Sequence, residues 1–536
     1  PFAPALTSSL IVTPQAGGTF VQAVDEDADT LNPLLTLNRT SQAVAGKLLP
    51  TLLGQDAHSG AITATELAER WTISADGRVY TFTLRANIFW SDGQPVAARD
   101  VQFTYAAIGD ETVQSPLQGS VEQIEKIETP DDYTVVITLH SANCAMLYAL
   151  RHPLLPSHRY AADFSDLRTN ELNETPTVSA GPFRFVSRIP GEAIRLERNP
   201  SYWKGTPRLA GWVYGVVPDP EERLALLAAG EVDGAPLDPA QITRTVALAG
   251  VRSYEYQADT FSFIALNLAD PANPQPGRDA ANAPIVQAPH PILGDAGVRR
   301  ALALSIDTGA MIEEVYAGKG FALASDVLPK VTWAYAANLQ PYTVDQAEAN
   351  TLLTAADWQD ADGDGVREKA GVALQLNLFT NSDNPQRIRM GELVQQQLAQ
   401  TGFDVRFQPL AFEELTSALL EQTYDMALIG WDGMSADPGN NAFWHSREDR
   451  PGVGFNFTSY QNAAVDQWLD GAQAAPGCNI NVRATLYRLV QAQIHADLPY
   501  IFLSGRTATW AYRDQWQGIQ PGMWQFDENV QDWREK

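Results

Sequence analysis

The alternation of helical and strand patterns in the second half of the sequence constrains the fold more than any other feature. A helical pattern spans residues 385–402 and ends at a glycine, and a strand pattern follows over 403–410. A second helix is predicted over 412–422 and a buried strand over 424–430. Strands joined through helices pair in parallel, because a parallel connection needs a crossover of about a dozen residues. We therefore expect an α/β domain with a mostly parallel sheet.

The first half of the sequence is rich in strand patterns instead. A strand is predicted at Thr19–Val24, and a hairpin turns at Asp76-Gly77 between two apolar runs. A further alternating strand is predicted over 133–140. Residues 271–292 contain six prolines and little periodicity, so we expect an exposed loop that marks a domain boundary.

Several helix ends are also readable. A helix before Gly230 is expected to stop at that glycine, and Asp307 is placed to cap a helix that Gly318 ends.

The charge balance excludes two classes of partner. The chain has 37 basic and 64 acidic residues, which gives a net charge of −27. Nucleic acids and anionic membrane surfaces attract basic proteins, so we expect neither as a partner. No apolar run reaches the roughly 20 residues of a membrane span. The chain begins at Pro1 with no visible signal peptide, so we expect a trimmed, exported chain whose leader and any lipid anchor are absent.

The two cysteines, Cys144 and Cys478, leave two alternatives open. In an exported chain they can form one disulfide, or they can remain two isolated buried thiols. The sequence does not contain the distance that would decide between them.

A catalytic interpretation finds no support in the motifs. The sequence lacks G-x-S-x-G, H-E-x-x-H, G-x-x-x-x-G-K-[ST] and G-x-G-x-x-G, and its seven histidines are scattered without an i,i+4 pair. We therefore expect no enzyme and no histidine metal cluster. A secreted acidic hydrolase is a remote alternative.

One loop resembles the first half of an EF-hand calcium site. In "DADGDGVRE" the three aspartates and a glycine have EF-hand spacing, but Gly371 stands where the bidentate glutamate is expected. Glu368 is the substitute ligand in this interpretation, and an Asp/Gly-rich turn with local hydrogen bonds is the simpler one. The calcium ligands would be Asp360, Asp362, Asp364 and Glu368.

Five segments, spread over nearly the whole chain and in the same order, resemble the family 5 extracellular solute-binding proteins of ABC importers. They are "GGTFVQAVDEDADTLNP", "ELAERWTISADGRVYTFTLRANIFWSDGQPVAARDVQFTY", "AGPFRFVSRIPGEAIRLERNPSYWKG", "GVRRALALSIDTGAMIEEVYAG" and "YDMALIGWDGMSADP". This family includes oligopeptide- and dipeptide-binding proteins.

The resemblance implies an α/β fold of the periplasmic-binding-protein type (type II, cluster C), with mixed sheets and two lobes that close on a ligand by hinge motion. An extra strand-rich subdomain belongs to the first lobe. The implied boundaries are 1–57, 181–269 and 505–536 for lobe I, 58–180 for the subdomain and 270–504 for lobe II.

The resemblance also implies a function. The chain would be the extracytoplasmic receptor of an ABC importer, either periplasmic or a cell-surface lipoprotein, and we expect a monomer. It would capture a peptide-like solute and deliver it to a membrane permease driven by separate ATPase subunits. No cofactor is expected beyond the calcium considered above. An oligosaccharide or other uncharged solute is the alternative ligand, and a sensory role is not distinguishable from transport.

The end of the strand at 424–430 is the expected ligand contact in lobe II. In the peptide binders, an aspartate three residues after the tryptophan pairs with the peptide α-amine, but Met434 stands there. Two arginines that serve peptide carboxylates in some members match Leu419 and Leu428. A buried ammonium without a counter-charge is strongly disfavoured, so Asp432 is the new candidate for the amine.

The remaining candidates follow from the same alignment. Trp431 and Phe412 are expected to stack on sugar rings or to cover apolar side chains. The main chain at Gly430 and the loop after Asn32-Pro33 would contact an extended ligand. The ligand-binding residues predicted in this way are Trp431, Asp432, Gly430, Met434, Phe412, Leu37, Asn38, Arg39, Asn384 and Phe502.

Overall fold

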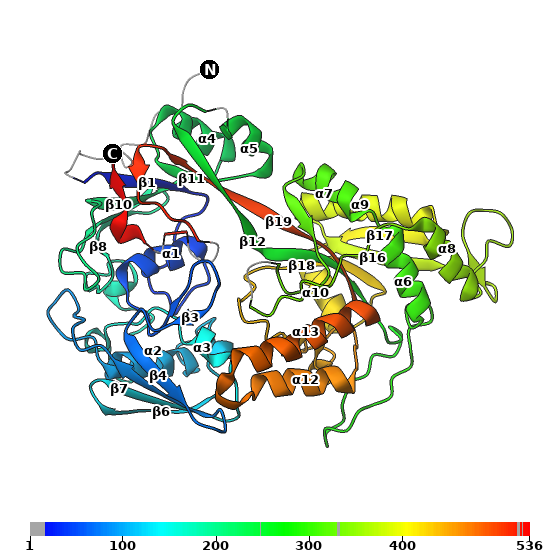
Figure 1. Ribbon diagram of the computed structural model, residues 1–536, viewed down its shortest axis with the longest axis horizontal. Helices are drawn as coiled ribbons and strands as arrows, with labels where there is room; N and C mark the ends of the chain where they lie inside the picture. Colours follow the sequence, from blue (N-terminus) through cyan, green and yellow to red (C-terminus); the bar gives the residue numbers. More distant parts are fainter. Residues whose placement is uncertain (1–16, 247, 330–332, 523–525, 528) are drawn as a thin grey trace. The chain divides into compact units, whose positions relative to one another are not determined.

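The structure is a computed structural model that describes residues 17–246, 248–329, 333–522, 526–527 and 529–536 (Figure 1). The first 16 residues, on which the expectation of a trimmed chain rests, lie outside the described part. The chain divides into two compact units. Unit 1 comprises residues 1–256, 474–479 and 508–536, and unit 2 comprises 257–473 and 480–507.

Unit 1 contains five neighbouring strands of the large sheet, in the order β11-β1-β10-β9-β8. β1 pairs in parallel with β10, and antiparallel ladders join β10 to β9 and β9 to β8. Phe20 of β1 packs on Trp212 of β10 with 4.6 Å between ring centroids, and Trp533 lies against both rings. The bounds are β1 Thr19–Val24, β8 Phe183–Ile189, β9 Ala193–Arg198, β10 Gly211–Val216 and β11 Gly234–Leu237, with helices α1 Arg39–Leu48, α4 Pro220–Ala229 and α5 Pro239–Val246.

A second, four-stranded antiparallel sheet lies within the span predicted as a subdomain. Its order is β4-β5-β7-β6, and α2 precedes β6 in the chain. Tyr80, Phe82, Val135 and Ile137 are fully buried, which confirms the alternating pattern read from the sequence. The bounds are β4 Ala68–Ile73, β5 Val79–Leu84, α2 Ala98–Gly109, β6 Ile124–Asp131, β7 Thr134–Leu139 and α3 Met146–Ala149; the short strands are β2 Gly54–Gln55, β3 Ile62–Thr63, β20 Trp516–Gln517 and β21 Arg534–Glu535.

Unit 2 has the predicted helix–strand alternation. β17, β16 and β18 are parallel neighbours, whereas β12 joins β18 in an antiparallel ladder, so the sheet is mixed. The strands are β16 Gln375–Asn381, β17 Asp404–Leu410 and β18 Met426–Trp431, with short strands β13 Gly320–Ala322, β14 Glu368–Lys369 and β15 Val372–Ala373. The helices are α6 Ala296–Ser305, α7 Thr308–Tyr316, α8 Gln346–Ala355, α9 Pro385–Ala399, α10 Phe412–Leu420, α11 Asn441–Trp444, α12 Ala463–Gln473 and α13 Ile480–Asp497.

Two long strands carry the chain from one unit to the other. β12 (Val251–Leu266) passes the boundary at residues 256 and 257, and β19 (Tyr500–Arg513) passes it at 507 and 508. The proline-rich segment 271–292, which was expected at the crossing, lies wholly within unit 2 as a loop. A strand that continues through a boundary leaves no proline or glycine signature there, because its hydrogen-bonded ladder needs neither residue.

The helix ends follow the sequence signals. Gly230 has φ +76° and ends α4, and the side chain of Asp307 accepts a hydrogen bond from the Ala310 N–H at the start of α7. α7 ends one residue earlier than predicted, because Ala317 itself adopts the left-handed conformation with φ +50° before Gly318. Asn and Gly are the usual residues at such a cap, so an alanine there gives no sequence signal.

Cys144 and Cys478 form a disulfide, with 5.3 Å between their Cα atoms. The structure therefore selects the bridge over two isolated thiols. Cys478 lies in segment 474–479, which groups with unit 1 although the helices on both sides of it, α12 and α13, belong to unit 2.

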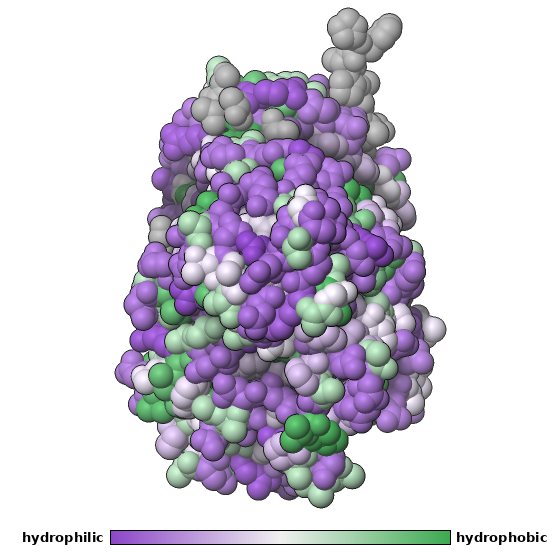
Figure 2. Space-filling model, turned by 90° about the vertical axis from the view of Figure 1, so that its right-hand side faces the viewer, coloured by the Kyte–Doolittle hydropathy of each residue, from purple (hydrophilic) through white to green (hydrophobic). Residues whose placement is uncertain are grey.

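Among the described residues, none of the helices combines the length and the hydropathy needed to cross a membrane. The face of the molecule in Figure 2 is mostly hydrophilic, and apolar residues occur on it in small separate groups.

A candidate ligand-binding site in unit 2

The end of β18, where the sequence predicts contact with a ligand, lies at a pocket within unit 2. Pocket and strand share Ile429, Gly430 and Trp431, the last three residues of β18. The ladder between β18 and β16 ends at Ala427, whereas β12 pairs with β18 as far as Trp431. Among the described residues, these three are therefore paired with a neighbouring strand on one edge only.

The pocket is small and mostly apolar. Its volume is about 200 Å³, below the roughly 300–1,000 Å³ of sites that hold whole small-molecule ligands. A pocket of this size suits one side chain or one chemical group of a larger ligand. Its apolar lining comes from α10, β18 and the loop after α11: Phe412, Leu415, Leu419, Leu420, Ile429, Trp431, Phe455 and Phe457.

Trp431 belongs to an aromatic cluster. Its ring stacks on Phe443, with 4.4 Å between centroids and 11° between planes, and Phe455 meets it edge-on at 6.0 Å. Because Phe443 covers one face of the indole, a ligand can contact only the part of the Trp431 ring that the cluster leaves exposed. Phe412 and Phe455 are 60% and 49% exposed, so two large apolar rings face outward beside the pocket.

One charged side chain, Arg387 from the first turn of α9, lines the same pocket. Its guanidinium donates a hydrogen bond from Nη1 to the Asn381 side-chain oxygen at 3.1 Å. A Cβ placed on Gly430 would lie 2.6 Å from Nη2 of this arginine and 2.6 Å from the Phe261 carbonyl oxygen. Glycine at 430 therefore leaves the space in which the guanidinium sits.

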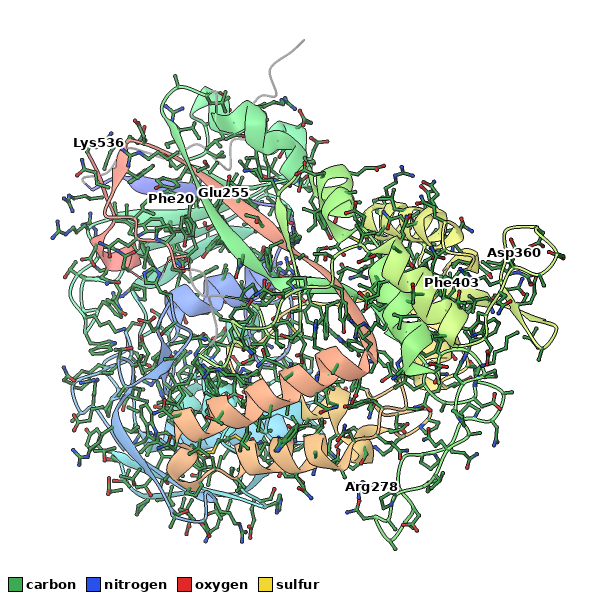
Figure 3. All side chains as sticks on the ribbon, turned by 45° about the vertical axis from the view of Figure 1, so that its right-hand side comes forward. Phe20, Glu255, Arg278, Asp360, Phe403 and Lys536 are labelled. Carbon is green, nitrogen blue, oxygen red and sulfur yellow. A yellow bond between two sulfur atoms is a disulfide. The ribbon has the colours of Figure 1, made fainter. Side chains whose placement is uncertain are left out.

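The predicted calcium loop is the second cluster of interest in unit 2. The side-chain oxygens of Asp360, Asp362, Asp364 and Glu368 lie within 4.8 Å of one another. They also accept backbone hydrogen bonds within the loop, for example Asp360 from Gly363 and Gly365. Asp360 lies on an exposed loop of unit 2 (Figure 3), so the turn interpretation stays open and calcium stays a prediction.

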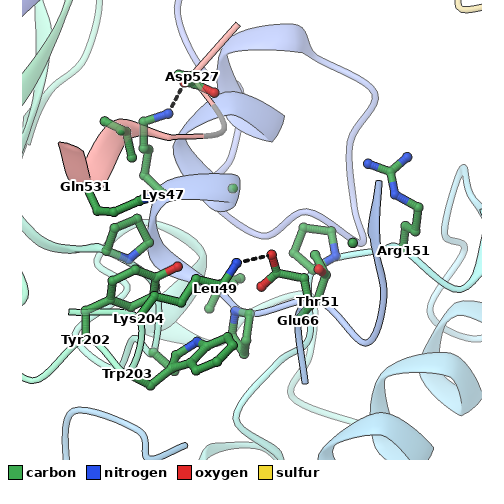
Figure 4. A pocket seen from close by; sticks show the side chains of 18 of the residues that line it. Lys47, Leu49, Thr51, Glu66, Arg151, Tyr202, Trp203, Lys204, Asp527 and Gln531 are labelled. Carbon is green, nitrogen blue, oxygen red and sulfur yellow. Dashed lines mark hydrogen bonds and ion pairs between the residues drawn. The ribbon is translucent and has the colours of Figure 1, made fainter. Parts of the chain in front are cut away.

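Unit 1 has a larger cavity of a different kind, with a volume of about 410 Å³ (Figure 4). Two ion pairs cross it. Lys47 pairs with Asp527, and Lys204 pairs with Glu66 at 2.5 Å. Both lysines also lie over indole rings, at 4.8 Å from the Trp212 centroid for Lys47.

The chain matches the family model for bacterial extracellular solute-binding proteins, family 5, over residues 63–451. This match covers most of the sequence.

The chain belongs to this family.

Similar proteins support the assignment. Protein XP55 of Streptomyces lividans is 27% identical over 506 residues, which cover 94% of this chain and 86% of the relative. The oligopeptide-binding protein AppA of Bacillus subtilis is 25% identical over 501 residues and is covered to 86%. The structure of AppA with a nonapeptide has a TM-score of 0.72, 23% identity and coverage of 98% of this chain and 100% of that one. The two-lobed fold expected from the sequence is thereby confirmed.

Family membership shows a binding protein. The residues that the resemblance assigned to ligand contact lie in both units. Asp432 is exposed beyond the end of β18 and acts electrostatically on Arg387. The Met434 N–H donates a hydrogen bond to the Asp259 carbonyl, which anchors that residue to β12. Gly430, Trp431 and Phe412 line the pocket, so three of the predicted residues lie together.

The other predicted residues have structural partners of their own. The side-chain oxygen of Asn384 accepts from the Arg387 N–H and caps α9. Phe502 is buried beside Phe261 and Tyr500. Ligand contact by either residue stays a prediction.

In unit 1, Asn38 caps α1 by accepting from the Ser41 N–H, and its amide donates to the Asp27 carbonyl. Leu37 is 67% exposed, and the Arg39 N–H donates to Glu26. A ligand contact of Leu37 and Arg39 stays a prediction, as does main-chain contact by this loop.

Arg387 and Phe455 were missed by the sequence analysis. The segment "PQRIRM" contains two arginines, and no pattern distinguishes the one that lines a pocket from the one that faces solvent. Helical spacing places them on different sides of α9, but only the neighbouring strands show which side is covered.

Proposed function

We propose that this protein is the extracytoplasmic receptor of an ABC importer, and that it captures a peptide and delivers it to a membrane permease driven by ATPase subunits. The observation that carries the proposal is the apolar pocket at the open end of β18 in a member of this family. Such a receptor needs only to bind its ligand and release it, and it catalyses no reaction in this role.

A peptide is favoured as ligand by two observations. The relative AppA is named an oligopeptide-binding protein, and its structure holds a nonapeptide. In this chain, the edge of β18 beyond Ala427 has no ladder partner among the described residues. Such an edge can pair with the main chain of an extended peptide, and the adjacent pocket can take one of its side chains.

An extracytoplasmic location is supported by the disulfide between Cys144 and Cys478. Disulfides persist mainly in oxidising compartments, such as the periplasm and the cell surface.

The test begins with a thermal-shift screen of the purified protein after its ligand has been stripped. A pool of short peptides should raise the melting temperature, because a ligand that binds only the folded form stabilises it. A shift with oligosaccharides alone would retain the receptor and reject the peptide. Sustained release of product from peptides or glycosides would reject the receptor itself.

The pocket is then tested with Trp431→Ala. Loss of the indole should weaken peptide binding by on the order of 1–3 kcal/mol, measured by isothermal titration calorimetry. The matched control is Trp203→Ala, which removes an indole from the polar cavity of unit 1 and should leave the affinity unchanged. Equal affinities for the Trp431 variant and the unmodified chain would remove the pocket from the site.

A further inference from the structure

Arg387 is the feature of the pocket that a general peptide receptor does not explain. A guanidinium has five N–H donors, and the hydrogen bond to Asn381 uses one of them. The side chain is half-buried, and Nη2 lies against the Cα of Gly430. Most of its capacity to donate is therefore unused by the described residues.

The charge of Arg387 is also poorly balanced. Among the described residues, no carboxylate lies within the 4.0 Å of an ion pair with its nitrogens, and the charges of Asp432 and Asp383 act on it from farther away. Burial lowers the pKa of Arg387, but an arginine stays protonated in proteins. A partly desolvated cation without a counter-ion is unfavourable.

Other arginines of unit 2 have more partners among the described residues. Arg483, which is more deeply buried, has Asp437 at 2.7 Å. Arg389, two residues along α9 from Arg387, contacts both Glu314 and Glu392.

Within the described part of the chain, Arg299 also lacks a carboxylate partner, but its guanidinium donates to three backbone carbonyls. Arg387 differs because it has one hydrogen-bond acceptor among the described residues.

We propose that Arg387 binds a carboxylate of the ligand, and that the pocket holds the apolar group next to that carboxylate. This inference rests on the proposed function and specifies its ligand class: a peptide whose last residue has a large apolar side chain and a free C-terminus. The guanidinium suits this task because it can donate two parallel hydrogen bonds to one carboxylate. Leu415 and Leu419, which are both buried, line the pocket and reduce the access of water to this interaction.

The position of Arg387 also bears on the two arginines that the family resemblance leads us to expect and that this chain lacks. Leu419 and Leu428 occupy the places of the arginines that serve peptide carboxylates in some relatives, and Leu419 lines this pocket. Arg387 reaches the same pocket from α9, so the cation is provided by a different element.

The experiment uses three probes with the ligand-stripped full chain. The first is a pool of tripeptides that all end in phenylalanine, the second is the same pool with amidated C-termini, and the third is 3-phenylpropionate. Apparent affinities come from thermal-shift titration. The acid pool should bind at least tenfold more tightly than the amide pool.

Three variants separate charge from structure. Arg387→Gln should remove the preference for the acid pool, and Arg387→Lys should keep part of it, because lysine retains the charge but not the planar donors. Arg389→Gln, on the same helix with its own two carboxylate partners, should keep the full preference.

Each failure has its own meaning. Equal affinity for the acid and amide pools, or an acid preference that survives Arg387→Gln, would overturn the carboxylate site and leave the peptide receptor standing. Binding of 3-phenylpropionate that depends on Arg387, without binding of either pool, would retain the carboxylate site and reject the peptide. No binding of any carboxylate probe at millimolar concentration would overturn the inference.

Discussion

The cavity of unit 1 and the pocket of unit 2 differ in how their charges are balanced. In unit 1, Lys47 and Lys204 each have a carboxylate partner from the same unit. In unit 2, Arg387 faces an apolar pocket with one amide as its hydrogen-bond partner. The comparison teaches that cavity size is a poor guide to function here. The larger cavity has ion pairs of its own across it, whereas the smaller pocket leaves a cation for a ligand to satisfy.

The largest effect is expected in unit 1. Asp527→Ala leaves the buried Lys47 ammonium without its carboxylate, and breaking one side of a buried pair typically costs about 3–5 kcal/mol. We expect a loss of this order in the free energy of unfolding, measured by urea denaturation, with unchanged ligand affinity of the folded protein. A loss of affinity without a loss of stability would make the polar cavity a binding site and reverse the comparison.

The next largest effect is the pH dependence of stability, which we expect from a buried aspartate in each unit. Burial raises the pKa of Asp449 in unit 2 to about 6, although Gln422 and Gln287 donate to it, and it raises the pKa of Asp233 in unit 1 to about 6. Because the folded state holds these protons more tightly than the unfolded state, their contribution to stability is complete below about pH 4 and is lost as the pH rises through about 6.

Each aspartate should contribute up to about 3 kcal/mol to this pH dependence. We expect the stability difference between Asp449→Asn and the unmodified chain to change across this pH range, and Asp233→Asn to behave in the same way. Unfolding by urea at pH 4, 5, 6 and 7 measures it. A flat difference for one variant would show that its carboxylate is less buried than the other.

The predicted calcium loop provides a comparison with a cluster of negative charges. Four carboxylates lie close together in this loop, whereas the pocket contains one cation. The four residues are Asp360, Asp362, Asp364 and Glu368. If the loop binds calcium, a concentration about tenfold above the dissociation constant should stabilise the protein by about 1.4 kcal/mol, and Asp362→Asn should abolish the gain. Titration of a chelator-stripped sample that shows no binding below millimolar calcium would leave the loop as a turn.

The smallest effect is expected for Arg387→Gln on stability. Removing a half-buried cation without a carboxylate partner takes away an unfavourable charge along with one hydrogen bond, so the two changes offset each other. The free energy of unfolding should change by less than about 1 kcal/mol. A loss as large as that of Asp527→Ala would show that Arg387 is structural and would end the contrast between the two cavities.

Much of the fold could be predicted because it rests on local patterns. The alternation of Tyr80 and Phe82 in β5, and the helix–strand order that ends in β18, are set by burial of one face of each element. The expected loop at 271–292 was also found, but the crossing between units was not, since it lies inside two continuous strands. The ladder of a strand gives no sign of where a domain ends.

The lining of the pocket was predicted in part for the same reason, and its role in ligand binding stays a prediction. Gly430, Trp431 and Phe412 were found from a strand end and from the family resemblance, and they do lie at one pocket. Asn384 and Asn38, also predicted as ligand contacts, cap helices in the structure, and their contact with a ligand stays a prediction. The family resemblance assigned all of these residues to ligand contact, because a match of residue positions does not show which way a side chain points.

The sequence by itself determined the family and the identity of most helices and strands, because these depend on patterns along the chain. Only the tertiary structure decided that Cys144 pairs with Cys478, that Phe443 covers one face of Trp431, and that Arg387 rather than Arg389 lines the pocket. Such contacts join residues far apart in the chain, and whether a charge is paired depends on a distance that no local pattern encodes.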